Sequence, residues 1–394
     1  MDVGEKEVCQ MIRITDPSEC CGCTACMAVC PYDAVHMKAD RLGFQYPEVD
    51  IARCVDCGLC ERVCAFAGAL QQCHSVPEDI SLKVEAVRHR DDLVVSRSQS
   101  GGAFTALSDY ILDEGGVIYG AVFNNPKEVC HKRAGTREER DAMRGSKYVQ
   151  SDMGTVFRQV REDLASGRKV LFTGTPCQVA GLKSYIPESL RANLVLVDFI
   201  CHGVPSPSVW RDYVSHMERK GRLVKATFRD KAAGGWKKHV ETFEYDSGKL
   251  VVRETFRILF YKNIMLRHSC SVCPYNILDH KSDVTIADFW GVDEVCPEMD
   301  GDAGVSMVIC NTERGSAILQ TVSETVDSHT LMLDYAIMSR RNPNLLRPAK
   351  IYKDRMKFEE EFARKGFLYV ARRWSDLGIR YRLWQLKRLL IKSR

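Results

Sequence analysis

Two runs of four cysteines stand near the start of this 394-residue chain. The first reads C-x2-C-x2-C-x3-C-P and ends at Pro31; the second repeats the cysteine spacing from Cys54 to Cys64, with Ala65 where the first has proline. Four thiolates at this spacing are typical ligands of a [4Fe-4S] cluster. The two runs therefore predict two clusters, and so a protein that moves single electrons.

The expected ligand sets are crossed, because where two such runs share a domain the fourth cysteine of each ligates the other cluster. One cluster is expected to take Cys20, Cys23, Cys26 and Cys64, and the second to take Cys54, Cys57, Cys60 and Cys30. A zinc site is the alternative, since C-x2-C pairs also occur in zinc ribbons. Two full runs in tandem favour iron and sulfide.

Four further cysteines stand in distinctive settings: Cys177, Cys201, Cys270 and Cys273. Cys177 follows Gly174, Thr175 and Pro176, where Thr175 is expected to cap a helix whose dipole would favour a thiolate. A C-x2-C turn and a strand end would supply the other ligands. We expect a third [4Fe-4S] cluster here; a zinc site, a redox disulfide and buried cysteines without a metal are the alternatives. The remaining cysteines are interpreted as structural: Cys9, Cys21, Cys73, Cys130, Cys296 and Cys310.

Two glycine- and serine-containing loops precede predicted helices. The stretch 96–102 ends in the pair Gly101 and Gly102. Because glycine has no Cβ, the backbone N–H groups at this helix start would be accessible to a phosphate. The stretch 145–151 places Lys147 among hydroxyl groups, where it could bind an anion or a substrate carbonyl. Both patterns are also compatible with ordinary solvated loops.

These sites need three regions to position them. Residues 1–75 are expected to form a small α+β domain with two short strands, at 34–37 and 43–46. From residue 82 to 345 strands and helices alternate, with strands expected at 116–123, 169–173, 194–200, 284–289 and 305–310, and a hairpin at 240–256. This order predicts an α/β body with a mixed sheet.

The segment 346–394 is expected to be a basic amphipathic helical tail. From residue 372 onward it carries eight basic residues against Asp376 alone, a net +7, beside an apolar stripe that runs from Phe367 through Trp374 and Trp384 to Ile391. Such a helix could lie on an acidic membrane surface or a partner, or it could pack on its own domain.

Composition is that of a soluble globular protein, with 45% hydrophobic and 27% charged residues. The formal charge of +4 counts all cysteines as neutral; two clusters, each −2 with its four thiolates, would bring it to 0 and three to −2. The first 15 residues show no signal peptide, and the stretch 194–201 is too short to span a bilayer. A cytoplasmic location, where thiols stay free for iron, and no nucleic-acid partner are expected.

Six stretches together resemble the beta subunits of coenzyme F420-reducing hydrogenase and dehydrogenase. They are 98–102 (SQSGG), 145–151 (GSKYVQS), 172–183 (FTGTPCQVAGLK), 198–205 (DFICHGVP), 270–275 (CSVCPY) and 283–291 (DVTIADFWG). Ala287 departs from the pattern, in which glycine is expected. The N-terminal two-cluster domain, which is ferredoxin-like, also resembles the input subunits of F420H2 dehydrogenase.

The resemblance implies an FAD between the clusters and an acceptor that exchanges a hydride with it. It also implies candidate cofactor-binding residues: Ser98, Ser100, Gly101, Gly102, Lys147, Gly174 and Thr175. Cys177, Cys201, Cys270 and Cys273 would hold the cluster nearest the flavin, while Lys147 or His202 would stabilise negative charge or donate a proton.

Three functions remain open on the sequence. The first is an FAD and iron–sulfur oxidoreductase with a small-molecule acceptor, coenzyme F420 or another organic substrate, and a low-potential electron donor. The second is an electron-transfer subunit that feeds a partner enzyme. The third is a zinc-stabilised interaction protein without iron.

Overall fold

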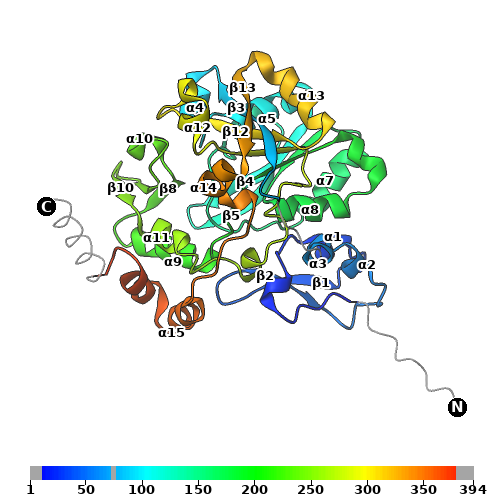
Figure 1. The fold of residues 1–394 in the computed structure, drawn as a ribbon. Coiled ribbons are helices and arrows are strands. Elements are labelled where there is room, and N and C mark those ends of the chain that lie inside the picture. Colours follow the sequence, from blue (N-terminus) through cyan, green and yellow to red (C-terminus); the bar gives the residue numbers. More distant parts are fainter. Residues whose placement is uncertain (1–10, 72–76, 379–394) are drawn as a thin grey trace.

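The computed structural model describes residues 11–71 and 77–378 (Figure 1). Its first part is a small α+β domain built on one antiparallel hairpin, β1 (Val35–Ala39) and β2 (Gln45–Val49). Short helices flank the hairpin: η1 (Pro17–Glu19), α1 (Ala25–Val29), α2 (Leu59–Arg62) and α3 (Ala65–Leu70).

The body is built on an eight-stranded sheet in the order β13-β3-β12-β11-β7-β6-β4-β5. Neighbours β4, β6, β7 and β11 are parallel, whereas β5, β12 and β13 pair antiparallel with theirs. The strands are β3 (Ser81–His89), β4 (Val117–Asn125), β5 (Glu128–Ala134), β6 (Val170–Thr173), β7 (Leu194–Phe199), β11 (Val284–Asp288), β12 (Ser306–Cys310) and β13 (Val326–Asp334). The predicted α/β body with a mixed sheet behind a ferredoxin-like domain is confirmed.

Helices cover both faces of this sheet. Side chains of α7 (Val156–Ala165) and α8 (Pro176–Tyr185) share one apolar core with the sheet, and those of α5 (Ala103–Asp113) and α13 (Glu313–Thr321) share another. Shorter elements connect them: α4 (Asp92–Arg97), α6 (Arg137–Asp141), η2 (Glu188–Asn193), α12 (Val292–Val295), η4 (Pro297–Met299), η5 (Val322–Glu324), α14 (Tyr335–Arg341) and η6 (Pro343–Leu345).

A second, three-stranded sheet is inserted between β7 and β11. It consists of β8 (Leu223–Phe228), β9 (Glu241–Tyr245) and β10 (Leu250–Arg253), in the order β10-β9-β8. Around it lie α9 (Pro207–Glu218), α10 (Lys231–Gly234), α11 (Thr255–Tyr261) and η3 (His268–Ser271). The segment 270–275 (CSVCPY) lies near the end of this insertion, before the chain returns to the main sheet at β11.

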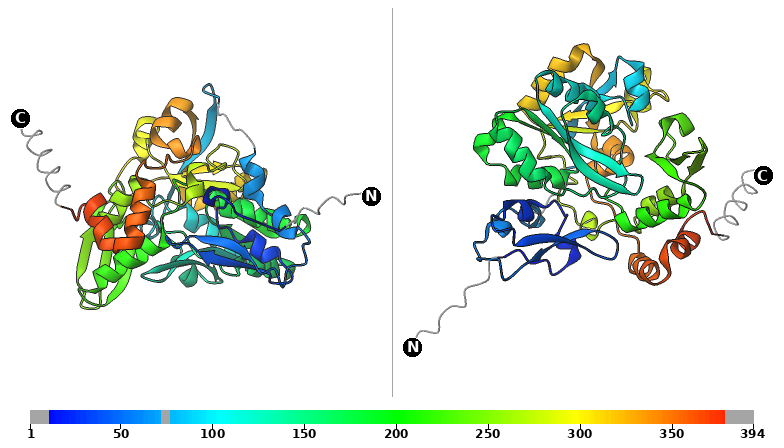
Figure 2. Two further views of the ribbon diagram at one scale, coloured as in Figure 1. Left: turned by 90° about the horizontal axis from the view of Figure 1, so that it is seen from below. Right: turned by 180° about the vertical axis from the view of Figure 1, so that it is seen from behind.

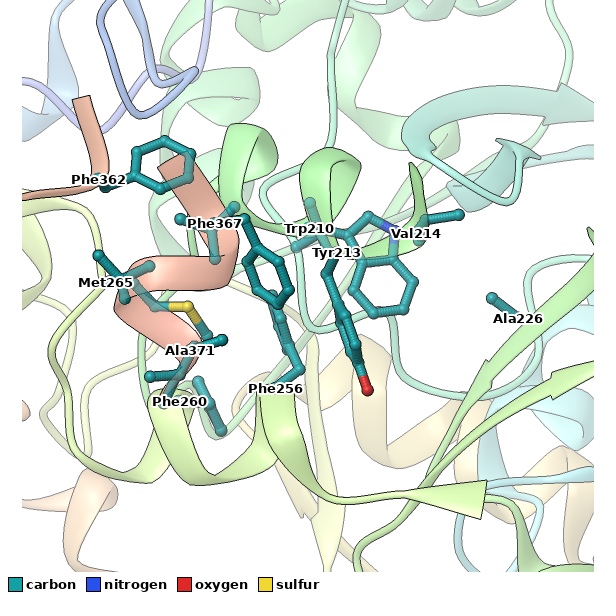
Figure 3. Close-up of a cluster of buried hydrophobic side chains, with 14 of the residues drawn as sticks. Trp210, Tyr213, Val214, Ala226, Phe256, Phe260, Met265, Phe362, Phe367 and Ala371 are labelled. Atoms are coloured by element: carbon teal, nitrogen blue, oxygen red, sulfur yellow. The ribbon is translucent and has the colours of Figure 1, made fainter. Parts of the chain in front are cut away.

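The last described helix, α15 (Arg355–Trp374), packs on this insertion. Figure 3 shows Phe362, Phe367 and Ala371 of α15 directed toward the aromatic side chains of α9 and α11. Gly366, with φ 73°, breaks the helix into two parts. Of the apolar stripe expected in the tail, Phe367, Val370 and Trp374 are buried here, while Tyr381, Trp384 and Ile391 lie outside the described residues.

The N-terminal domain lies against the body beside α7 and α8 (Figure 2). Helices α1 and α3 both contact α8, and Ala25 and Ala28 share a core with Val156 and Val160 of α7. The two cysteine-rich regions of the sequence are thereby brought together. None of the described helices is long and apolar enough to cross a membrane.

Candidate electron-transfer site

The crossed arrangement of the N-terminal cysteines is visible in the structure. Cys30 lines one cavity together with Cys54, Cys57 and Cys60, although Cys30 belongs to the first run. The peptide N–H of Ile12 donates to Cys60 Sγ at 3.2 Å, and that of Ala34 donates to Cys30 Sγ at 3.3 Å. Such N–H donors stabilise sulfur that carries negative charge, as a cluster ligand does.

The other four cysteines of the two runs form a second group. Cys26 interacts electrostatically with Cys23, Cys20 and Cys64, so the last cysteine of the second run joins the first. Burial raises the pKa of the Cys26 thiol well above its ordinary value. A buried thiol of this kind becomes a thiolate when a metal replaces its proton.

The four distinctive cysteines of the body line a single cavity. Cys177 lies in the first turn of α8, directly after β6, and Cys201 lies two residues beyond β7. Because β6 and β7 are parallel, these two positions meet at the carboxyl edge of the sheet, where α/β folds place their ligands. Cys270 of η3 and Cys273 approach the same edge from the insertion.

The local sequence explains how Cys177 is positioned. Thr175 and Gln178 form a capping box, with each side chain bonded to the backbone N–H of the other, and Pro176 occupies the first helical position. The Thr175 hydroxyl lies 3.1 Å from Cys177 Sγ. A hydrogen bond from Cys21, followed by the Thr175 contact, lowers the pKa of Cys177 to about 7, whereas burial raises that of Cys270 to about 11.

The spacing of the thiols separates a cluster from a single zinc ion. Tetrahedral zinc with Zn–S bonds of about 2.3 Å holds its thiolates about 3.8 Å apart. Within residues 11–71 and 77–378, the one group of three potential ligands with atoms within 4.8 Å of one another is Cys296, Glu298 and His329, outside all three cysteine sets. No described cysteine forms a disulfide. Among the described residues, no three thiols of one set lie as close together as a single tetrahedral zinc ion requires.

The first N-terminal set and the body set are immediate neighbours. Cys21, interpreted from the sequence as structural, hydrogen-bonds with both Cys23 and Cys177 and lines the body cavity. A small apolar cluster of Cys21, Phe66, Ala180 and Tyr275 contacts thiols of both sets: Cys23, Cys64, Cys177 and Cys273. Nothing in the sequence beyond the Cys20–Cys21 doublet indicates this position.

The loop 98–102 is bonded to the surrounding protein. The hydroxyl of Ser98 donates to Val94 O at 2.7 Å and that of Ser100 donates to Val305 O at 2.5 Å. The backbone of Gly101 packs so closely on β3 that an added Cβ would lie 2.2 Å from Val87 O. Gly102, with φ 93°, is the N-cap residue of α5. Glycine at both positions is required by packing and by backbone conformation.

The two motif loops meet through Gln99. Its amide oxygen accepts from Ser146 N at 3.3 Å, and its amide nitrogen donates to Arg229 O at 3.3 Å. Beside this contact, Lys147 donates to the carbonyl oxygens of Ala142 and Arg144, each at 2.9 Å. Burial lowers the pKa of the Lys147 ammonium to about 7.

His202 and Gly174 lie beside the body cysteines without being directed at them. The two ring nitrogens of His202 contact the amide oxygens of Asn344, at 3.1 Å, and Asn263, at 2.6 Å. Its ring lies edge-on to Phe260, with centroids 4.9 Å apart. Gly174 N donates to Val197 O, which fixes the turn between β6 and α8.

Sequence reasoning missed a polar and aromatic group at the same sheet edge. Arg229 makes a two-pronged ion pair with Asp288, the last residue of β11, and the indole N–H of Trp236 donates to Asp288 at 2.7 Å. Trp236 stacks on Trp290 with centroids 5.0 Å apart, and the Arg229 guanidinium lies over the Trp290 ring. The sequence motif DFWG (288–291) was the one local indication of this group, but the residues that contact it, Arg229 and Trp236, come from the insertion.

The fold and the three cysteine sets define an iron–sulfur protein of the oxidoreductase class concerned with electron transfer. Residues 85–158 match the N-terminal domain, and residues 167–332 the C-terminal domain, of coenzyme F420 hydrogenase/dehydrogenase beta subunits. Residues 19–67 match a 4Fe-4S dicluster domain. The chain belongs to the coenzyme F420 hydrogenase/dehydrogenase beta subunit family, which confirms the resemblance seen in its motifs.

Individual relatives are more distant. The chain is 34% identical to a CoB--CoM heterodisulfide reductase iron-sulfur subunit from Methanocaldococcus jannaschii, over 19% of this chain and 13% of that protein. It is 24% identical to an uncharacterized protein of the same organism, over 42% of this chain and 52% of that one. It therefore spans about half or less of the length of these curated relatives. A chain of the F420-reducing [NiFe] hydrogenase complex from Methanosarcina barkeri matches with a TM-score of 0.45 and 20% identity, covering 65% of this chain and 85% of that chain.

Proposed function

We propose that this chain is an iron–sulfur flavoprotein oxidoreductase that passes electrons through three [4Fe-4S] clusters to FAD and exchanges a hydride with an organic acceptor, coenzyme F420 or another. The observation that carries the proposal is the contact between the first N-terminal cysteine set and the body set through Cys21. Thiols of both sets contact one apolar cluster, so clusters held by these thiols would be close enough for electron transfer.

The outer and inner proposed ligand sets follow the two cavities, and the middle set follows the electrostatic interactions of Cys26. Cys30, Cys54, Cys57 and Cys60 hold the outer cluster; Cys20, Cys23, Cys26 and Cys64 hold the middle cluster; Cys177, Cys201, Cys270 and Cys273 hold the inner cluster. When bound, a flavin accepts electrons one at a time from iron and releases them in pairs with a proton, so its place is between the inner cluster and the acceptor.

The proposed flavin site is the carboxyl edge of β3, β6, β7 and β11. Three groups of this chain lie along that edge: the loop 98–102 and the Arg229–Asp288 pair, which Gln99 joins, and the turn Gly174–Thr175. Lys147 lies beside the joined loops, and an ammonium whose pKa is about 7 can hold or release a proton near neutral pH. The His202 ring is held between Asn263 and Asn344, and it would fix the conformation of the backbone next to Cys201.

A second candidate function is an electron-transfer subunit that feeds a partner enzyme. The family consists of beta subunits of hydrogenases and dehydrogenases, and Cys57 is exposed at the outer set, where a donor or partner protein could approach. We place the protein in the cytoplasm because no described cysteine forms a disulfide and a reducing compartment keeps thiols available for iron.

Purification without oxygen, with iron, sulfide and flavin measured per chain, tests the proposal. Three cubane clusters require about twelve irons, with one FAD. About eight irons without flavin would favour the carrier, and zinc without iron would leave an interaction protein. An assay with a reduced low-potential dye and candidate acceptors then distinguishes the enzyme from the carrier, since a carrier reduces no acceptor by itself.

A further inference from the structure

Arg267 connects the body to the N-terminal domain at the contact between the two cysteine sets. Its side chain is 1% exposed. Nε donates to Cys20 O at 2.7 Å, Nη2 donates to Gln45 O at 2.8 Å, and Nη1 donates to Gln150 Oε1 at 2.9 Å. The guanidinium also lies over the Tyr46 ring, 4.2 Å from its centroid. Two of these bonds cross from the body to the N-terminal domain.

Arg267 forms no contact ion pair with a carboxylate among the described residues, and the Asp40 carboxyl acts on it only from farther away. Other buried arginines of this protein do: Arg229 pairs with Asp288, and Arg140 pairs with Asp109 at 2.7 Å. Carbonyl and amide oxygens satisfy the N–H groups of Arg267, but they do not neutralise its charge. A buried cation without a close counter-charge is costly, so further negative charge near Arg267 would stabilise it.

Asp40 and the Tyr46 phenol interact electrostatically with Arg267, and the other groups around it that can carry negative charge are thiols of the two neighbouring sets. Arg267 interacts electrostatically with Cys20 and Cys23 on the N-terminal side and with Cys177 and Cys270 on the body side. A [4Fe-4S] core in its 2+ state with four thiolates carries two negative charges, and one more after reduction. In a buried, low-dielectric setting such charges attract the guanidinium strongly.

We propose that Arg267 is the shared counter-charge of the middle and inner clusters, raising the reduction potential of both while it holds the two domains in register. This inference rests on the proposed function. One electron leaves the reduced middle cluster, which returns from 1+ to 2+, and enters the inner cluster, which goes from 2+ to 1+, with no proton moved. A cation between them stabilises the electron on either side.

The test is a redox titration of the anaerobically purified holoprotein, with the reduced clusters followed by electron paramagnetic resonance. Arg267→Gln should shift the midpoint potentials of the middle and inner clusters to lower values. The outer cluster should not shift, because Cys60 of that set interacts with Cys54 and with the backbone of Ile12, Cys60 and Glu61. Arg267→Lys keeps the charge and should recover most of the potential.

A matched control separates charge from docking. Arg158 of α7 also joins the domains, donating to Met27 O, Ala28 O and Cys30 O, but its charge is paired with Asp33 at 2.7 Å. Arg158→Gln should loosen the interface, seen as faster hydrogen exchange in α1 and α8, while the potentials stay near those of the wild type. Equal potential shifts in Arg158→Gln and Arg267→Gln would show that docking alone matters and would overturn the proposal.

A second variant covers the case in which Arg267→Gln does not load iron. Gln150→Glu leaves the arginine in place and offers it a carboxylate at the 2.9 Å contact. Neutralised in this way, Arg267 should no longer raise the two potentials, which should fall as in Arg267→Gln. Unchanged potentials in an iron-replete Gln150→Glu protein would refute the inference. Eight irons in the wild type would instead refute the proposed inner cluster, and the middle cluster would still report on Arg267.

Discussion

Gly181 of α8 lies against Cys23 of the N-terminal domain: a Cβ added to Gly181 would sit 2.7 Å from Cys23 Sγ. This glycine lies one helical turn after Cys177, so a close contact between the two domains involves one proposed ligand, Cys23, and lies near another, Cys177. A cysteine that holds iron cannot rotate away from an intruding methyl group. The contact therefore restricts position 181 to glycine.

Gly181→Ala should weaken the interface and the middle cluster. Overpacking of this kind costs about 1–3 kcal/mol, and we expect lower iron content and a lower midpoint of thermal unfolding. Gly68→Ala is the matched control, because Gly68 lies in α3 at the same interface but has nothing within 4 Å of its Cβ position. Alanine there should be neutral or stabilise by up to about 1 kcal/mol. If Gly181→Ala kept the full iron content and the stability of the wild type, the contact between Gly181 and Cys23 would not require glycine.

Cys177→Ser should remove the inner cluster alone. Serine is a poor ligand for iron in this chemistry, so iron per chain should fall by about four while the two N-terminal clusters keep their spectra. Cys310→Ser is the control: Cys310 lies on β12, outside all three sets, and its loss should change no iron. A Cys177→Ser protein with the full iron content would contradict the assignment.

Cys60→Ser addresses the N-terminal domain in the same way. Cys60 lines the outer cavity with Cys30, Cys54 and Cys57, so this change should cost the outer cluster. Flavin bound at the carboxyl edge of the body sheet should remain, measured by its absorbance after protein release. Loss of flavin together with the outer cluster would show that the two regions do not bind their cofactors independently.

Local signals in the sequence predicted much of the fold. Thr175, Pro176 and Gln178 specify the start of α8 through bonds within one turn, and apolar runs specify β6 and β7. Strand β13 was not predicted, because its pattern is largely exposed and its pairing partner, β3, is more than two hundred residues away. Local periodicity carries no information about such pairing.

The same distinction between local and long-range signals applies to the residues of the candidate site. Cysteine ligands at fixed spacings are readable from the sequence, since one turn of chain supplies several of them. The roles of Cys21 and Arg267 are not, because each depends on a contact between domains distant in sequence. The Arg229–Asp288 pair likewise joins the insertion to β11. Such residues become visible when the fold has placed their partners.

Phe367→Ala tests whether α15 is part of the body core. Phe367 is 5% exposed and stacks on Tyr213 with ring centroids 5.1 Å apart (Figure 3). Loss of a buried phenylalanine costs about 3–5 kcal/mol, so the variant should show a clearly lower unfolding midpoint in urea. Met356→Ala, on the same helix but 61% exposed, should stay within about 0.5 kcal/mol of the wild type. Equal effects of the two changes would argue against a packed α15.

Glu241 provides a test of pH dependence. It lies on β9 and is 1% exposed; Oε1 accepts from Arg257 N at 2.5 Å, whereas Oε2 has no partner among the described residues. Burial raises the pKa of the Glu241 carboxyl from 4.5 to about 8. Between these values the folded protein keeps a proton that the unfolded chain has released, so stability falls as the pH rises through this window.

Glu241→Gln removes this dependence. The free energy of unfolding of the variant relative to the wild type should rise with pH between about 5 and 8, with a slope of at most about 1.4 kcal/mol per pH unit, and level off above. Urea unfolding of the anaerobic protein across that range measures it. Glu244→Gln is the control, because Glu244 is exposed on the same strand and should leave the slope unchanged. If the difference in free energy of unfolding between Glu241→Gln and the wild type were the same at about pH 5 and about pH 8, Glu241 would be ionised in the folded protein across this range.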